Sequence, residues 1–259
     1  MRNYLKFYAI CTFVKSGGGL DSAMSKPLLV FDLDGTLVDS AHDLMGTLNH
    51  VLAFCEVAPL PLDSARSLLG AGARALLRRG FAAQGITLAD ARLERLFSQF
   101  ISHYSDHIAD KSPLFPGVLA ALDALEAEGF RFAVCTNKLE TLALKLLTAL
   151  KVEHRFAAIC GQDSCIIDGK QVQKPDARAL FHTIYSAGGN ITRAIMIGDS
   201  KTDIDTAKAA KLPVIAVDFG YTDRPVHDFF PDSVISHFDA LPRAVNQLAA
   251  HLDLTHSRA

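Results

Sequence analysis

The sequence lacks the features of a disulfide-stabilised or nucleic-acid-binding protein. Its 259 residues include only five cysteines, an odd number with no C-x-x-C pair, and Cys135 and Cys160 fall in apolar, strand-like runs. We therefore predict buried thiols in the reducing cytoplasm, not a disulfide framework. The formal net charge of −2 provides no basic surface of the kind that binds nucleic acid.

No apolar run approaches the roughly 20 residues that a membrane-spanning helix needs, so we expect no membrane anchor. The N-terminal run Phe7–Val14 is short and ends at Lys15. A signal peptide is one interpretation of this run. We favour a dispensable extension over residues 1–24, because Met24 begins Met-Ser-Lys-Pro-Leu-Leu, a natural start for a first strand.

A zinc-binding cluster is also missing. Among the ten histidines, the pair His103 and His107 has the i, i+4 spacing of two ligands on one helix face. No glutamate follows His103, and no cysteine or further histidine lies near the pair in the sequence. We interpret both residues as polar positions on a solvated helix face.

The sequence does contain an acidic motif directly after a buried strand. Pro27–Phe31 is an apolar run with β-branched and aromatic residues, typical of a strand buried on both faces. Asp32 and Asp34 follow at i and i+2, so an extended backbone projects them to the same side. A simple Asp-Gly turn at Asp34 and Gly35 is the alternative. We favour a functional site, because two adjacent carboxylates are costly to bury without a cation or ligand.

The segment Phe31–Ser40 resembles motif I of the haloacid dehalogenase superfamily, the aspartate-nucleophile phosphatases and phosphomutases. This resemblance implies that Asp32 is the nucleophile and Asp34 the general acid and base. It also implies a Rossmann-like core of class α/β, with a doubly wound, mainly parallel sheet. Three further motifs should follow in a fixed order.

The chain between residues 41 and 111 has a helical pattern. Apolar residues recur at helical spacing in three stretches, and no segment is typical of a strand. We predict an α-helical cap domain over residues 41–111. It would be inserted into a core domain of residues 25–40 and 112–259.

The second and third motifs supply candidate phosphate ligands. Thr136 ends a second buried strand, where a hydroxyl can bind a phosphate oxygen or simply cap the next helix. Its position resembles motif II, which implies Thr136 and Asn137 as phosphate-binding residues. Lys174 precedes Pro175, and a Lys-Pro pair alone carries little information. Its order in the chain resembles motif III, with Ala177 where the family often has another proline.

The fourth motif is Gly-Asp-Ser-x-x-Asp, from Gly198 to Asp203. Acidic residues near a helix start can be structural. However, Asp199 follows a strand as Asp32 does, and ligands bind outside the carboxyl ends of parallel strands. Resemblance to motif IV implies that Asp199 binds a metal, with Ser200 and Asp203 supporting the site.

These residues imply a magnesium-dependent enzyme. Mg²⁺ is a hard cation that prefers oxygen ligands, and the resemblance assigns it to Asp32, Asp199 and the backbone carbonyl of Asp34. We predict a phosphatase that forms an aspartyl-phosphate and acts on a small phosphorylated metabolite. The best candidate substrate is 2-phosphoglycolate. We expect the protein to be a monomer or a homodimer. A phosphomutase of the β-phosphoglucomutase type is the alternative within the superfamily.

A phospho-accepting signalling module is the alternative from another class. It too places aspartates, a threonine and a lysine at the ends of parallel strands. Its acid pair and its acceptor lie on different strands, whereas Asp32 and Asp34 here follow the same one.

Substrate specificity should come from the helical cap. The turn with Gly70 and Gly72 allows close approach, and Arg74 could bind a substrate carboxylate bidentately. The alternative for Arg74 is a solvated surface charge.

Overall fold

The structure is a computed structural model that describes residues 26–64, 68–222 and 224–256. The extension predicted at residues 1–24 lies outside the described residues. The described cysteines are all free thiols; Cys135, Cys160 and Cys165 are buried, as predicted, whereas Cys55 is only partly buried. No helix in the described ranges is long and apolar enough to cross a bilayer.

A six-stranded parallel sheet with the order β3-β2-β1-β6-β7-β8 forms the centre of the molecule. This confirms the predicted fold class. The sequence pattern missed the edge strand β8 and a small antiparallel hairpin, β4 (Ile166–Ile167) with β5 (Lys170–Gln171). The sheet strands are β1 (Leu28–Phe31), β2 (Arg131–Cys135), β3 (Phe156–Cys160), β6 (Ala194–Gly198), β7 (Val214–Val217) and β8 (Ser233–Ile235).

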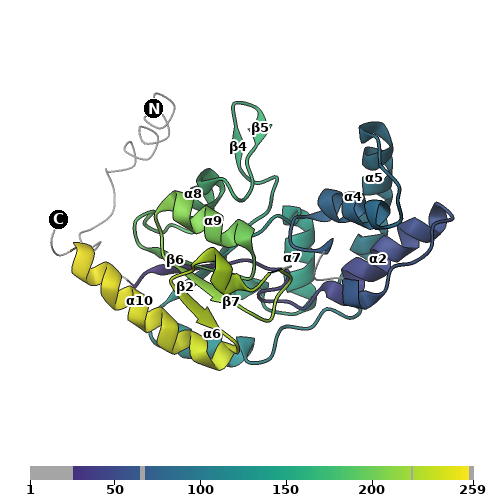
Figure 1. The fold of residues 1–259 in the computed structure, drawn as a ribbon. Coiled ribbons are helices and arrows are strands. Elements are labelled where there is room, and N and C mark those ends of the chain that lie inside the picture. The colour runs from purple at the N-terminus through teal and green to yellow at the C-terminus, as the bar shows by residue number, and fades with distance from the viewer. Residues whose placement is uncertain (1–25, 65–67, 223, 257–259) are drawn as a thin grey trace.

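Helices cover both faces of this sheet, as Figure 1 shows. Strand β1 alternates accordingly: Leu29 and Phe31 join one apolar cluster, and Leu28 and Val30 join the other. The first cluster includes residues of α6 (Val118–Ala127), α7 (Glu140–Ala149) and α10 (Leu241–His256), and the second includes residues of α8 (Ala177–Ser186) and α9 (Lys201–Ala210). Burial on both faces explains why the strands are continuous apolar runs.

We call residues 41–111 the helical insert, and its described part forms helices beside the sheet (Figure 1). In the described part of the insert there is no strand, in keeping with its periodicity. The apolar stripe of α5 buries Leu93, Leu96, Phe100 and Tyr104, at helical spacing. The described elements are α2 (Ala41–Phe54), η1 (Leu62–Ser64), α4 (Ala73–Ala83) and α5 (Asp90–Asp106).

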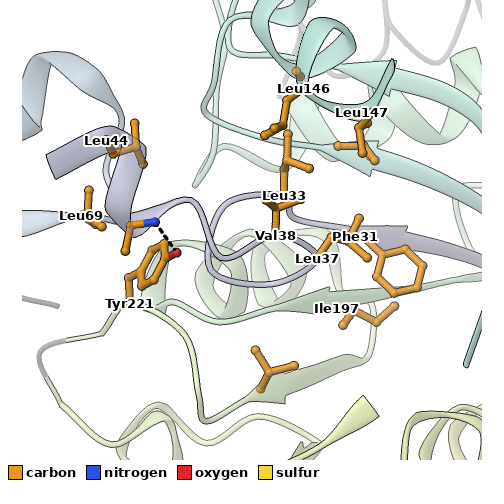
Figure 2. Packing of buried hydrophobic residues seen from close by; sticks show 14 of the residues in the cluster. Phe31, Leu33, Leu37, Val38, Leu44, Leu69, Leu146, Leu147, Ile197 and Tyr221 are labelled. Atoms are coloured by element: carbon orange, nitrogen blue, oxygen red, sulfur yellow. Dashed lines mark hydrogen bonds between the residues drawn. The ribbon is translucent and has the colours of Figure 1, made fainter. Parts of the chain in front are cut away.

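Both connections of the helical insert are tied by hydrogen bonds. At its start, the Ala41 amide donates to the Tyr221 hydroxyl over 2.8 Å, the dashed line in Figure 2, and that hydroxyl donates to Asp39 Oδ1 over 2.7 Å. At its end, Asp43 Oδ2 accepts from the Lys111 amide and the Ser112 hydroxyl. The chain therefore leaves and re-enters the core beside the end of β1.

Candidate active site

The carboxylates predicted from motifs I and IV lie together at the ends of two adjacent strands. Asp32 follows β1 and Asp199 follows β6, and the parallel register pairs Phe31 with Ile197, so the two strand ends are level. Carboxylate oxygens of Asp32, Asp199 and Asp203 lie within 4.8 Å of one another. The fold thus brings together Asp32 and the Asp199–Asp203 segment, which are far apart in the sequence.

Lys174 lies among these acids. Its Nζ is 2.9 Å from Asp32 Oδ1 and 2.5 Å from Asp203 Oδ1, and its side chain is 2% exposed. Asp203 is held in turn by a capping box at the start of α9, in which the Ser200 amide donates to Asp203 Oδ2 over 3.1 Å and the Asp203 amide donates to Ser200 Oγ. Ser200 Oγ also donates to Asp203 Oδ2 over 2.6 Å. The structure therefore brings Lys174, Ser200 and Asp203 to the site where the motifs predicted them.

Burial makes this cluster electrostatically expensive. It raises the pKa of Asp32 to about 6, although Lys174 acts in the opposite direction. It also raises the pKa of Asp199 well above its usual range, and the charges of Asp203 and Asp32 add to that shift. Burial alone would lower the pKa of Lys174, but Asp203 and Asp32 outweigh it and raise that pKa. One lysine therefore faces three acids, and another cation would relieve their repulsion.

The donor set suits a hard divalent cation such as Mg²⁺, because it consists of carboxylate oxygens with no sulfur or imidazole ligand among the clustered residues. Asp199 is oriented from two sides: Thr36 Oγ1 donates to its Oδ1 and the Tyr221 amide to its Oδ2. A Cβ atom on Gly35 would lie 2.5 Å from Asp199 Oδ2. The backbone after β1 thus approaches the acid closely, which only glycine permits.

The motif II residues line the same cleft as Asp32. Thr136 is buried directly after β2, and its Oγ1 accepts from the Lys138 amide over 3.2 Å. Asn137 Nδ2 donates to the carbonyl oxygen of Lys174 over 3.0 Å, so Asn137 ties the second motif to the third. Their contact with phosphate stays a prediction.

Asp34 has partners that the motifs did not indicate. Ser40 Oγ donates to its Oδ1 over 2.6 Å, and Lys138 Nζ donates to both carboxylate oxygens, at 2.9 and 3.0 Å. The same Nζ donates to the hydroxyl of Tyr104 on α5 over 2.7 Å. Sequence reasoning missed Lys138, although it directly follows Asn137. Only its position directly after motif II could have indicated a functional role. Lysine as a residue type gives no such indication, because most lysines lie on the surface.

The predicted specificity turn lies only partly at the cleft. Gly70 and Gly72 line it, and Cβ atoms there would lie 3.1 Å from the Tyr221 carbonyl oxygen and 3.3 Å from that of Asn137. Arg74 is not among the lining residues; it forms a bidentate pair with Glu94 at 2.8 Å, and its guanidinium carbon lies 3.6 Å from the centre of the Phe97 ring. Its guanidinium thus has partners within the helical insert, and a substrate contact by Arg74 stays a prediction.

Comparisons with known proteins agree with this geometry. The haloacid dehalogenase-like hydrolase family matches residues 29–217. A phosphoglycolate phosphatase from Mesorhizobium japonicum is 50% identical over 218 residues, which cover 84% of this chain and 94% of the relative. A phosphoglycolate phosphatase from Agrobacterium fabrum is 46% identical, covering 85% of this chain and 92% of the relative.

A solved structure has the same architecture. The crystal structure of a predicted phosphoglycolate phosphatase from Haemophilus somnus superposes with a TM-score of 0.75 at 27% identity. The match covers 87% of this chain and 99% of that chain. Sheet and helical insert are therefore shared across most of both molecules.

Proposed function

Because the chain belongs to the haloacid dehalogenase-like hydrolase family, we propose that it is a magnesium-dependent phosphatase for small phosphate monoesters, with 2-phosphoglycolate as its substrate. The observation that carries this proposal is the meeting of Asp32, Lys174 and Asp199 at the ends of β1 and β6. The names of the relatives support the choice of 2-phosphoglycolate.

In the proposed reaction, a carboxylate oxygen of Asp32 attacks phosphorus and the bond from phosphorus to the ester oxygen breaks, which leaves an aspartyl-phosphate. Asp34 gives its proton to the departing alkoxide. It then takes a proton from the water that attacks the phosphoryl group, and the Asp32 carboxylate is released. The two carboxylates can share this work because they project from one short segment after β1.

Other side chains bind and neutralise the phosphoryl group. Lys174 contacts Asp32, so its ammonium group would also lie close to the oxygens of the phosphoryl group that is transferred to Asp32, and would stabilise their negative charge. The Thr136 hydroxyl at the end of β2 would donate to another oxygen. Asp32, Asp199 and the Asp34 carbonyl would hold Mg²⁺, which when bound supplies positive charge against the phosphate dianion.

We propose that the helical insert acts as the cap of this site. Residues of α4 and α5 line the cleft together with Asp32 and Asp34, so the insert limits the size of the substrate and the access of water. The free thiols are consistent with the cytoplasmic location that we propose. Membership in a hydrolase family argues against the signalling alternative.

A phosphate-release screen with Mg²⁺ tests the proposed activity. The panel contains 2-phosphoglycolate, 3-phosphoglycerate, ethyl phosphate and β-glucose 1-phosphate, and kcat/KM is measured for each. We expect release over many turnovers, with the highest kcat/KM for 2-phosphoglycolate. Absence of release would contradict the phosphatase proposal. Conversion of β-glucose 1-phosphate to the 6-phosphate, faster than any release, would identify a mutase.

A further inference from the structure

The cleft between the helical insert and the core contains a buried cation that the proposed reaction has not used. Lys138 is the only lysine or arginine among the described residues that line this cleft. Its side chain is 5% exposed. A lysine pays a large desolvation cost at such a position, so its charge must be matched by what surrounds it.

The partners of Lys138 would place its ammonium group beside the leaving group of a bound ester. Its Nζ lies 2.9 and 3.0 Å from the two oxygens of Asp34, the residue that would protonate the ester oxygen. The ester oxygen of a bound substrate would therefore lie close to this ammonium group. In 2-phosphoglycolate a single methylene separates the ester oxygen from the carboxylate, which brings that carboxylate within reach of the same cation.

The remaining lining of the cleft favours a short, anionic leaving group over a sugar. Most lining side chains near Lys138 are apolar, so the hydroxyl groups of a sugar would find few partners. Two other cations of the described insert are engaged: Arg74 pairs with Glu94, and Arg79 donates to the carbonyl oxygens of Leu68 and Leu69. The apolar lining is contributed by Leu44, Leu69, Ala73, Leu76, Phe97, Phe100, Ile101, Leu139 and Leu142.

We propose that Lys138 determines substrate specificity by binding the carboxylate of the leaving group, so that the preferred substrates are phosphate esters of short 2-hydroxycarboxylic acids. This inference deepens the proposed phosphatase function and rests on it. It transfers to Lys138 the role that the sequence suggested for Arg74.

Tyr104 positions Lys138 for this role. Its hydroxyl oxygen accepts from Nζ over 2.7 Å, and the Nζ lies 4.4 Å from the centre of its ring. Burial, with the charges of Asp34 and Asp43, raises the pKa of Tyr104 well above its usual range, so the hydroxyl stays neutral. Because Tyr104 belongs to α5, the helical insert fixes the ammonium group over the core.

The test compares two esters with similar leaving-group chemistry. 2-Phosphoglycolate and 2-hydroxyethyl phosphate both release a primary alkoxide, but only the first carries a carboxylate. Lys138→Met should lower kcat/KM for 2-phosphoglycolate at least tenfold more than for 2-hydroxyethyl phosphate, chiefly through KM. Lys138→Arg, which keeps the charge, should retain part of the preference. Tyr104→Phe should reduce it by a smaller factor.

Lys145→Met is the matched control. Lys145 also reaches from the core to α5, where its Nζ donates to Ser105 Oγ over 2.8 Å, but this contact is exposed and Lys145 does not line the cleft. The ratio of the two kcat/KM values should be unchanged in this variant. Melting temperatures would show whether each variant is folded. If Lys138→Met does not fold, the ratio of the two kcat/KM values is measured in Tyr104→Phe and Lys138→Arg instead.

Two results overturn the inference in distinguishable ways. If the parent protein hydrolyses both esters and substitution of Lys138 lowers both kcat/KM values by the same factor, Lys138 acts only by positioning Asp34. The proposed function would survive that result. If the parent releases phosphate from neither ester, the proposed function fails and the inference falls with it.

Discussion

We expect Asp32→Asn to abolish turnover and leave the fold intact, because an amide cannot attack phosphorus to form the acyl phosphate. We expect kcat for 2-phosphoglycolate to fall by a factor of about 1,000 or more, as when a nucleophile is removed from an enzyme that depends on it. The measurement is phosphate release by freshly purified protein, with mass spectrometry to exclude deamidation back to aspartate. Appreciable turnover in the intact asparagine variant would remove Asp32 from its assigned role.

The stability of the same variant provides its control. The pKa of Asp32 is raised from 3.8 to about 6 in the fold, chiefly by burial. The folded protein therefore binds more protons than the unfolded chain between these values, and stability falls as pH rises through that window. Asparagine carries no such charge. Without metal at neutral pH, we expect the melting temperature of Asp32→Asn to equal or exceed that of the parent.

We expect removal of the metal to stop the reaction and Mg²⁺ to restore it. The physical reason is the buried cluster of Asp32, Asp199 and Asp203, whose repulsion a substrate dianion would increase. In excess chelator we expect phosphate release to fall to background. Mg²⁺ should also raise the melting temperature of the metal-free parent, because an ion that binds only the folded state stabilises it.

Asp199→Asn separates this metal effect from a general effect of chelator. The amide preserves the shape of the side chain but removes a charged ligand, so both the Mg²⁺-dependent rise in melting temperature and the rate should decrease. Asp205→Asn is a matched control on α9, because Asp205 pairs with Lys201 in an exposed contact away from the cluster. Full activity of the parent in excess chelator would contradict the assignment of a metal.

The sequence predicted the strands and the residues at their ends well, for physical reasons. A strand buried on both faces must be a continuous apolar run, so Leu28–Phe31 and Ala194–Gly198 stand out from the chain. An acidic residue directly after such a run does not contribute to apolar packing, so Asp32 and Asp199 could be recognised as candidate functional residues. The edge strand β8 is only Ser233–Ile235 and partly exposed, and it gave no such signal.

Contacts between single side chains of distant segments could not be predicted from the sequence. Arg74 and Glu94 are 20 residues apart, and only the packing of α4 against α5 makes them a pair. The bonds of Tyr221 to Asp39 and Asp199 depend on how the ends of β1, β6 and β7 meet. Lys138 could not be distinguished from a surface lysine, because its burial depends on Tyr104 from the helical insert.

A crystal structure of the protein with Mg²⁺ and beryllium trifluoride is the most direct test of the central assignment. Beryllium trifluoride bonds to a carboxylate oxygen and imitates an aspartyl-phosphate. We predict a bond to Asp32, with Lys174 and Thr136 at the fluorine atoms and the metal held by Asp32 and Asp199. A bond to Asp34 or Asp199, or a metal held away from both Asp32 and Asp199, would contradict the account.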